Sequence, residues 1–148
     1  MVSPEIFSHY PFFEGLGSDQ IEILANSAQD QIIEKNYYIF KEGEEINNLF
    51  LVLEGQACIL LMLPKKDVII TTFESGDVFG WSALVPPKTA TSSAKALTTC
   101  RIITFNGKVL REYFEKDYKF GYIMMQRIAH IIRTRLEYSR VITLALSA

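Results

Sequence analysis

The spacing of apolar residues changes twice along the chain. Near the start, Ile21, Leu24 and Ala28 recur at helical spacing after a polar stretch, which predicts a helix over about 18–27 with Ser18 as its cap. From about 31 to 105, short runs of Ile, Val, Phe, Tyr and Thr alternate with turn residues, the pattern of successive strands. From about 106 onward, apolar spacings of three and four predict a short helix and, after Asp117, a long one.

This order of elements predicts a mainly β fold with flanking helices. The all-β middle suits a double-sheet roll, with one helix before it and the C-terminal helices over about 106–147. At 148 residues, the chain fits one domain spanning 1–148, because single-core domains cluster at about 100 to 150 residues.

Composition and charge narrow the class of protein. Apolar residues make up 49% of the chain, enough for a buried core. The net charge of −2 and the lack of a basic block argue against nucleic-acid binding by this chain alone. We find no signal peptide and no apolar run long enough to cross a membrane, so we expect a cytoplasmic protein. Cys58 and Cys100 lie in predicted strands, where we expect reduced, buried thiols.

A glycine motif stands out within the β region. Residues 74–84 read Glu-Ser-Gly-Asp-Val-Phe-Gly-Trp-Ser-Ala-Leu. Gly76 and Gly80 permit backbone geometries closed to other residues, and the residues after Gly80 can begin a helical turn with free N–H groups. Such a nest could cradle an anion. Alternatively, the motif only turns a corner of the roll.

Two stretches together resemble the cyclic nucleotide-binding domain family. Residues 39–57 look like its paired early strands, with Gly43 and Gly55 at the turns, and residues 74–84 resemble the Gly-Asp-x-Phe-Gly-Glu-x-Ala-Leu start of its phosphate-binding cassette. The family includes the sensor domains of catabolite activator-type regulators and the regulatory domains of cyclic-nucleotide-dependent kinases and channels. The resemblance implies a double-stranded β-helix, a jelly-roll-like β-roll. It also implies a ligand-sensing regulatory module that is not an enzyme and that signals through its C-terminal helix. The small-molecule ligand would be a cyclic nucleotide (cAMP or cGMP) or another small anionic ligand.

The resemblance also implies a set of cassette residues at the ligand. These are Phe79, Gly80, Trp81, Ser82, Ala83, Leu84, Lys88, Ala90, Thr91 and Ser92.

Two cassette positions depart from the family's pattern. Trp81 replaces a glutamate that takes the ribose hydroxyl, and Ala90, ten positions after Gly80, replaces an arginine that grips the phosphate. Lys88 could substitute if the register slips by two, or it is a solvated loop lysine. Trp81 could line a pocket for an aromatic or apolar ligand, or it could plug the vacated site. These departures predict weak or altered nucleotide specificity.

In the family, the C-terminal helix both covers the ligand and forms a dimer. The register places Ser139 and Arg140 at the lid. We expect a homodimer whose seam comprises Met125, Ile128, Ile132, Arg135, Ser139 and Ile142, while Met124, Ile131 and Tyr138 pack toward the protein or broaden the seam. The alternative is that the helix buries its apolar residues against its own roll.

The residues favour this interpretation over an enzyme or a DNA-binding protein. A cupin-type enzyme needs a metal-binding cluster of histidines and carboxylates, and the chain has only His9, before the roll, and His130, on the last helix. Family members that bind DNA carry a helix-turn-helix after the long helix, which this sequence lacks. If the chain is a fragment, that argument lapses. A dimerisation or partner-docking domain with a decayed ligand pocket remains the main alternative.

Overall fold

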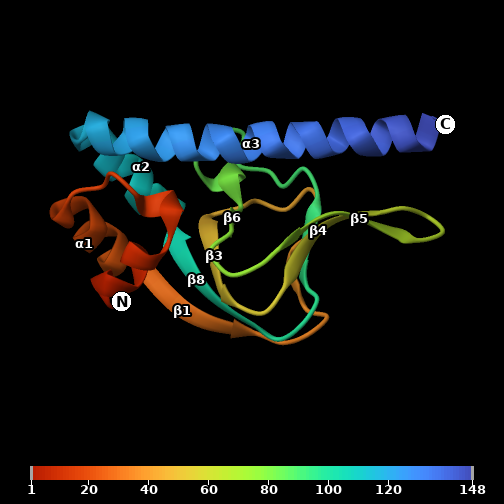
Figure 1. Ribbon diagram of the computed structural model, residues 1–148, viewed down its shortest axis with the longest axis horizontal. Helices are drawn as coiled ribbons and strands as arrows, with labels where there is room; N and C mark the ends of the chain where they lie inside the picture. Colours follow the sequence, from red (N-terminus) through yellow and green to blue (C-terminus); the bar gives the residue numbers. More distant parts are fainter. Residues whose placement is uncertain (1, 148) are drawn as a thin grey trace.

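The computed structural model describes residues 2–147 and contains a β-roll between helical segments (Figure 1). The elements are η1 Pro4–His9, η2 Pro11–Phe13, α1 Ser18–Ser27, β1 Ala28–Ile33, β2 Tyr38–Phe40, β3 Asn48–Glu54, β4 Ala57–Met62, β5 Asp67–Phe73, β6 Val78–Phe79, η3 Trp81–Ala83, β7 Ser93–Ala96, β8 Cys100–Asn106, α2 Gly107–Lys116 and α3 Tyr118–Ser147.

The strands form two antiparallel four-stranded sheets, as the sequence predicts. One sheet has the order β1-β8-β3-β6 and the other β2-β7-β4-β5. The roll begins at Ala28, earlier than predicted, because β1 pairs with β8 from Ala28 opposite Phe105 to Ile33 opposite Cys100. The early residues of β1 are polar and exposed, so alternation did not reveal this edge strand.

The start of α1 also differs from the prediction. Ser18 is the first helical residue, and Gly17 is the N-cap. The Gly17 backbone N–H donates to Oε1 of Gln20 at 2.9 Å. A side chain from within the helix therefore satisfies the end that Ser18 was expected to cap.

Two hydrophobic cores lie on opposite faces of the first sheet. The inner core fills the roll and comprises Phe40, Ile46, Phe50, Val52, Ala57, Ile59, Phe79, Ala83, Ala90, Ala94, Ala96, Cys100 and Ile102. The outer core joins this sheet to the helices and includes Phe7, Phe13, Leu24, Leu49, Leu51, Ile103, Phe105, Leu110, Phe120, Met124 and Ile128.

Strand β3 belongs to both cores because successive side chains point to opposite faces. Leu49 and Leu51 enter the outer core, whereas Phe50 and Val52 enter the inner core. The apolar run in β3 is continuous because both faces of the strand are buried. Cys58 and Cys100 are free and buried, as the sequence predicts, and burial raises the pKa of each thiol.

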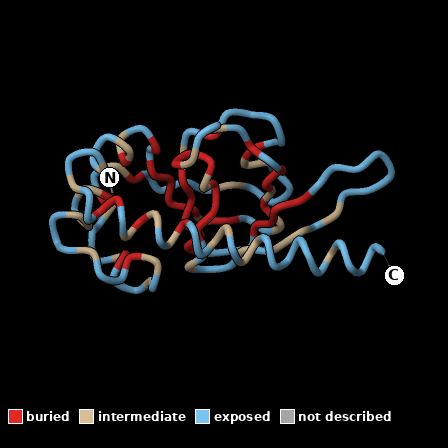
Figure 2. Tube along the Cα trace, turned by 90° about the horizontal axis from the view of Figure 1, so that it is seen from above, coloured by how far each residue is buried: buried red, intermediate tan, exposed pale blue. Residues whose placement is uncertain are grey.

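The long helix α3 runs along the whole molecule and extends past the roll (Figure 1). Its buried residues, Phe120, Gly121, Met124 and Ile128, all lie in its first half. Toward the C-terminus the trace becomes exposed (Figure 2). No helix among residues 2–147 is long and apolar enough to cross a membrane.

Candidate functional site

A cavity of about 740 Å³ lies between the roll and α3. Its walls come from side chains of the roll, the cassette, one side of α3 and the N-terminal segment. The lining residues include Phe40, Phe73, Phe79, Trp81, Ser82, Thr91, Ser92, Ile131, Thr134, Arg135 and Tyr138.

Aromatic rings form the floor on the roll side. The Phe73 and Phe79 ring centroids are 4.8 Å apart with the rings nearly parallel, and Phe79 stacks on Phe50 with centroids 5.0 Å apart. Phe40 lines the same cavity. This wall offers a flat, apolar surface to a ligand.

The cassette adopts the glycine-dependent geometry that the sequence predicts. Gly76 and Gly80 have φ of 93° and 83°. A Cβ on Gly80 would lie 2.7 Å from Phe50 Cδ2 and 2.9 Å from the Asn48 carbonyl, so the position excludes any side chain. The short turn η3 follows directly. Whether this turn holds an anion stays a prediction.

The start of α2 packs directly against the cassette. Arg111 donates a hydrogen bond to the Ala83 carbonyl. A Cβ on Gly107 would lie 2.8 Å from that carbonyl oxygen. The cassette is therefore connected to the C-terminal helices as well as to the roll.

Neither Ala90 nor its possible substitute Lys88 supplies a positive charge to the cavity. Ala90 is 3% exposed in the inner core, and its N–H donates to the Glu44 carbonyl at 2.8 Å. Lys88 does not line the cavity. Its Nζ lies 3.5 Å from the Glu45 carboxylate. The structure thus favours the loop-lysine alternative over the slipped register.

Trp81 combines the two roles that the sequence left open. Its side chain lines the cavity and also packs against the outer core. Its Nε1 is buried and has no hydrogen-bond partner among the described residues. The guanidinium carbon of Arg135 lies 6.0 Å from the Trp81 ring centroid, within the usual range of a cation–π contact.

The long helix contributes different residues from those predicted for the lid. Ser139 and Arg140 are exposed, and neither lines the cavity. The α3 residues that line the cavity instead include Thr134, Arg135 and Tyr138. Nη2 of Arg135 donates to Oγ of Ser92 at 2.5 Å. Burial lowers the pKa of Arg135, because desolvation disfavours the charged form.

Arg135 was predicted in the dimer seam, and its place in the cavity lining was not predicted. The residue spacing could have predicted this position. Arg135 follows Ile128 by seven residues and Ile131 by four, so all three lie on the side of α3 that faces the roll. Ile128 is fully buried in the outer core, so it cannot belong to an intermolecular seam. Ile142 follows Arg135 by seven residues and is partly exposed, so its place in the seam stays a prediction.

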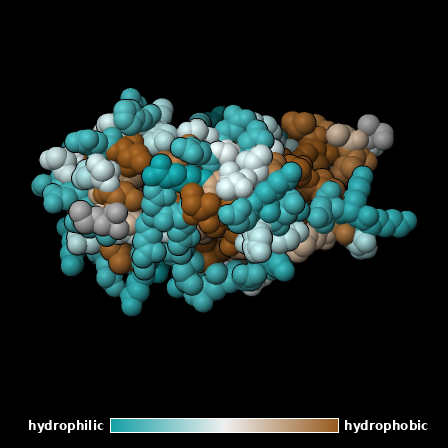
Figure 3. All heavy atoms as spheres, turned by 90° about the horizontal axis from the view of Figure 1, so that it is seen from below, coloured by the Kyte–Doolittle hydropathy of each residue, from teal (hydrophilic) through white to brown (hydrophobic). Residues whose placement is uncertain are grey.

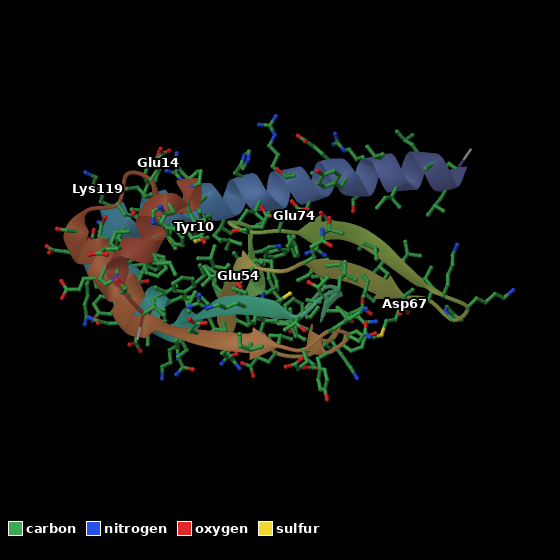
Figure 4. All side chains as sticks on the ribbon, turned by 60° about the horizontal axis from the view of Figure 1, so that its bottom comes forward. Tyr10, Glu14, Glu54, Asp67, Glu74 and Lys119 are labelled. Carbon is green, nitrogen blue, oxygen red and sulfur yellow. The ribbon has the colours of Figure 1, made fainter. Side chains whose placement is uncertain are left out.

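Charged groups also surround the mouth of the cavity. Glu14 lies in the N-terminal segment beside the first half of α3 (Figure 4), where Nη2 of Arg127 donates to its carbonyl at 2.6 Å. The exposed residues Asp77 and His130 also line the cavity. No group of three or more His, Cys, Asp or Glu residues within 2–147 could hold a metal ion.

Comparisons with known proteins agree with this architecture. The pattern of the cyclic nucleotide-binding domain matches residues 31–117. A solved structure from Geobacter metallireducens GS-15, assigned to cyclic nucleotide binding, is 32% identical with a TM-score of 0.82, and the match covers 92% of this chain and 99% of that one.

Two curated relatives are longer than this chain. The CRP-like cAMP-activated global transcriptional regulator of Mycobacterium tuberculosis is 23% identical over 130 residues, 87% of this chain and 58% of the regulator. A cGMP-dependent protein kinase of Eimeria tenella is 32% identical over 91 residues, 60% of this chain and 9% of the kinase. The chain therefore spans little more than half the length of the first of these relatives.

Proposed function

This chain belongs to the cyclic nucleotide-binding domain family, and we propose that it senses a small ligand in the cavity between the roll and α3. The observation that carries the proposal is the cavity of about 740 Å³ with an aromatic floor and a cationic side chain above it. Ligand sites of this kind are concave, mostly apolar and furnished with a few polar groups. The proposed role is regulatory binding, with occupancy passed on through α3 to the rest of the protein.

We propose that the ligand is not held as a cyclic nucleotide is held in the family. Trp81 stands where the family's glutamate takes the ribose hydroxyl, and an indole offers only an N–H donor. Ala90 supplies no charge, and Lys88 pairs with Glu45 outside the cavity. Hydrogen bonds to charged groups contribute about 1.5 to 3 kcal/mol each, so losing two weakens cAMP binding by about 100-fold or more.

Calorimetry and thermal unfolding test this function. The panel comprises cAMP, cGMP, AMP, adenosine and small aromatic acids with their amides. A ligand present at 100 times its dissociation constant stabilises the fold by about 2.7 kcal/mol. We expect at least one compound to do so, with cAMP binding weaker than micromolar. Submicromolar cAMP binding contradicts the altered specificity, and no response to any compound favours the docking-domain alternative.

A matched pair of variants shows whether binding occurs in the cavity. Thr91 is exposed and lines the cavity, whereas Thr89 is exposed two residues away and does not. We expect Thr91→Trp to obstruct the cavity and abolish the ligand-induced stabilisation. Thr89→Trp adds the same side chain and should preserve it. Equal responses from both variants would place the ligand elsewhere.

We also propose that the chain pairs as a symmetric homodimer through an apolar stripe on α3. The stripe comprises Tyr118, Tyr122, Met125, Ala129, Ile132 and Leu136, at alternating intervals of four and three residues. That spacing is typical of coiled-coil seams. Met125 and Ile132 are partly buried against the outer core, whereas Leu136 is 54% exposed. A two-fold pairing covers both copies of the stripe at once.

A further inference from the structure

Arg135 is a largely buried cation without an ionic partner. No Asp or Glu carboxylate within the described residues lies in ion-pair distance of its guanidinium. Its contacts are the Ser92 hydroxyl at 2.5 Å and the face of Trp81. Buried charges in proteins are normally paired, because desolvation of an isolated ion is costly. An arginine that lines a cavity without an ionic partner can therefore bind an anion through its charge and its remaining N–H donors.

The surroundings of Arg135 favour an oxyanion. A guanidinium has five N–H donors in a fixed fork, and one N–H bond to a side chain is made here. Ser92 is 2% exposed, and two further residues with hydroxyl groups, Ser82 and Thr91, line the same cavity. The lining carboxylates belong to Glu14 and Asp77, both exposed, and the Asp77 carboxylate accepts from the Glu74 backbone N–H at 2.8 Å.

We propose that Arg135 and Ser92 form an anion subsite that takes the carboxylate or phosphate of a small organic anion. The apolar body of that ligand lies along the aromatic wall of Phe73, Phe79 and Phe40. A guanidinium fork matches the paired oxygens of either group. The inference rests on the proposed ligand-sensing function and deepens it, because it names the charge and the position of the recognised group.

The position of the subsite also gives the ligand a means of regulation. Arg135 belongs to α3, whereas Ser92 immediately precedes β7 of the roll. An anion held by both therefore bridges the helix and the roll. A ligand shifts a conformational equilibrium only through differential affinity for the two states, and a bridging anion favours the state in which α3 lies against the roll.

Trp81 provides a local reporter for the test, since it is the single tryptophan of the chain and lies beside Arg135. Trp81 emission is followed while the intact protein is titrated with inorganic phosphate, with 3-phenylpropionate and its neutral amide, and with AMP and neutral adenosine. We expect saturable responses to the anions, each organic anion binding more tightly than its neutral counterpart. The two organic pairs distinguish carboxylate from phosphate as the preferred group.

Variants on α3 assign the response to one side chain. We expect Arg135→Gln to weaken anion binding by about 10- to 100-fold and to leave the neutral compounds unaffected. Arg135→Lys should fall between the two, because an ammonium keeps the charge without the fork. Arg133→Gln is the matched control, since Arg133 lies two residues away, is exposed and pairs only with Glu137 at 3.3 Å.

The outcomes separate this inference from the broader function. If neutral and anionic members bind equally, or if Arg135→Gln keeps the preference for the anion, the subsite is overturned while ligand sensing stands. If no compound changes either Trp81 emission or thermal stability, the subsite and the proposed function both fail. Loss of the preference for the anion in Arg135→Gln, with Arg133→Gln unchanged, supports the subsite.

Discussion

The two halves of α3 are one continuous helix with opposite relations to the rest of the chain. In the first half, Met124 and Ile128 are completely buried in the outer core. From Leu136 to Ser147 no described residue is buried, and Leu144 and Leu146 are 71% and 80% exposed. The first half is thus stabilised by tertiary packing, whereas the second half presents apolar side chains without a cover in this chain.

The β4–β5 hairpin projects beneath the second half of α3 (Figures 1 and 4). Met62, Leu63 and Ile69 on this hairpin are about half exposed. Figure 3 shows apolar side chains gathered at this end of the molecule. Arg135 and the cavity lie where α3 leaves the core, so the proposed ligand would act at the junction between the buried and the exposed half.

The largest expected effect comes from one of two alanine substitutions that compare the halves of α3. Ile128→Ala should lower the free energy of unfolding by about 2 to 5 kcal/mol, because it leaves a cavity in a packed core. Leu144→Ala should change it by no more than about 0.5 kcal/mol in the monomer, because the side chain is mostly in water. Urea denaturation at low protein concentration measures both. Equal losses would show that the second half packs as tightly as the first.

Substitutions in the apolar stripe of α3 give the next largest effect. Ile132→Glu combined with Leu136→Glu should raise the dissociation constant of the dimer by about 100-fold or more, since pairing would bury unpaired charges. Light scattering against concentration measures the change. Arg133→Gln combined with Arg140→Gln alters the net charge equally on the polar side of α3 and should leave the dimer intact. A wild-type chain that stays monomeric at high concentration would contradict the proposed homodimer.

Most of the fold could be predicted because the sequence encodes it locally. The change from strand alternation to helical spacing near Asn106 matches the observed boundary between β8 and α2. The glycines of the cassette also predicted its backbone, because Gly80 leaves no room for a side chain. The start of β1 was missed, since its polar residues are positioned by pairing with the distant strand β8.

The site was less predictable from sequence because periodicity identifies a helix face without showing what that face meets. Ile128 and Arg135 share one stripe of α3, yet Ile128 enters the outer core and Arg135 covers the cavity. Only the three-dimensional structure shows where the core ends along that stripe. The same limit explains why Ser139 and Arg140 were predicted at the lid, whereas Thr134, Arg135 and Tyr138 are the residues of this part of α3 that line the cavity.

The smallest expected effect concerns the stability of the unliganded protein at this junction. Burial lowers the pKa of Arg135, which means that the folded environment disfavours its charge. Arg135→Gln removes that cost together with the Ser92 hydrogen bond and the Trp81 contact, each of which contributes about 1 kcal/mol. These opposing changes should leave the free energy of unfolding within about 1 kcal/mol of the wild type, in contrast to Ile128→Ala. Urea denaturation without ligand measures the free energy of unfolding of both proteins. A loss above about 2 kcal/mol would assign Arg135 to the structural half of α3, whereas an unchanged or higher stability combined with lost anion binding is the signature of a residue kept for its ligand.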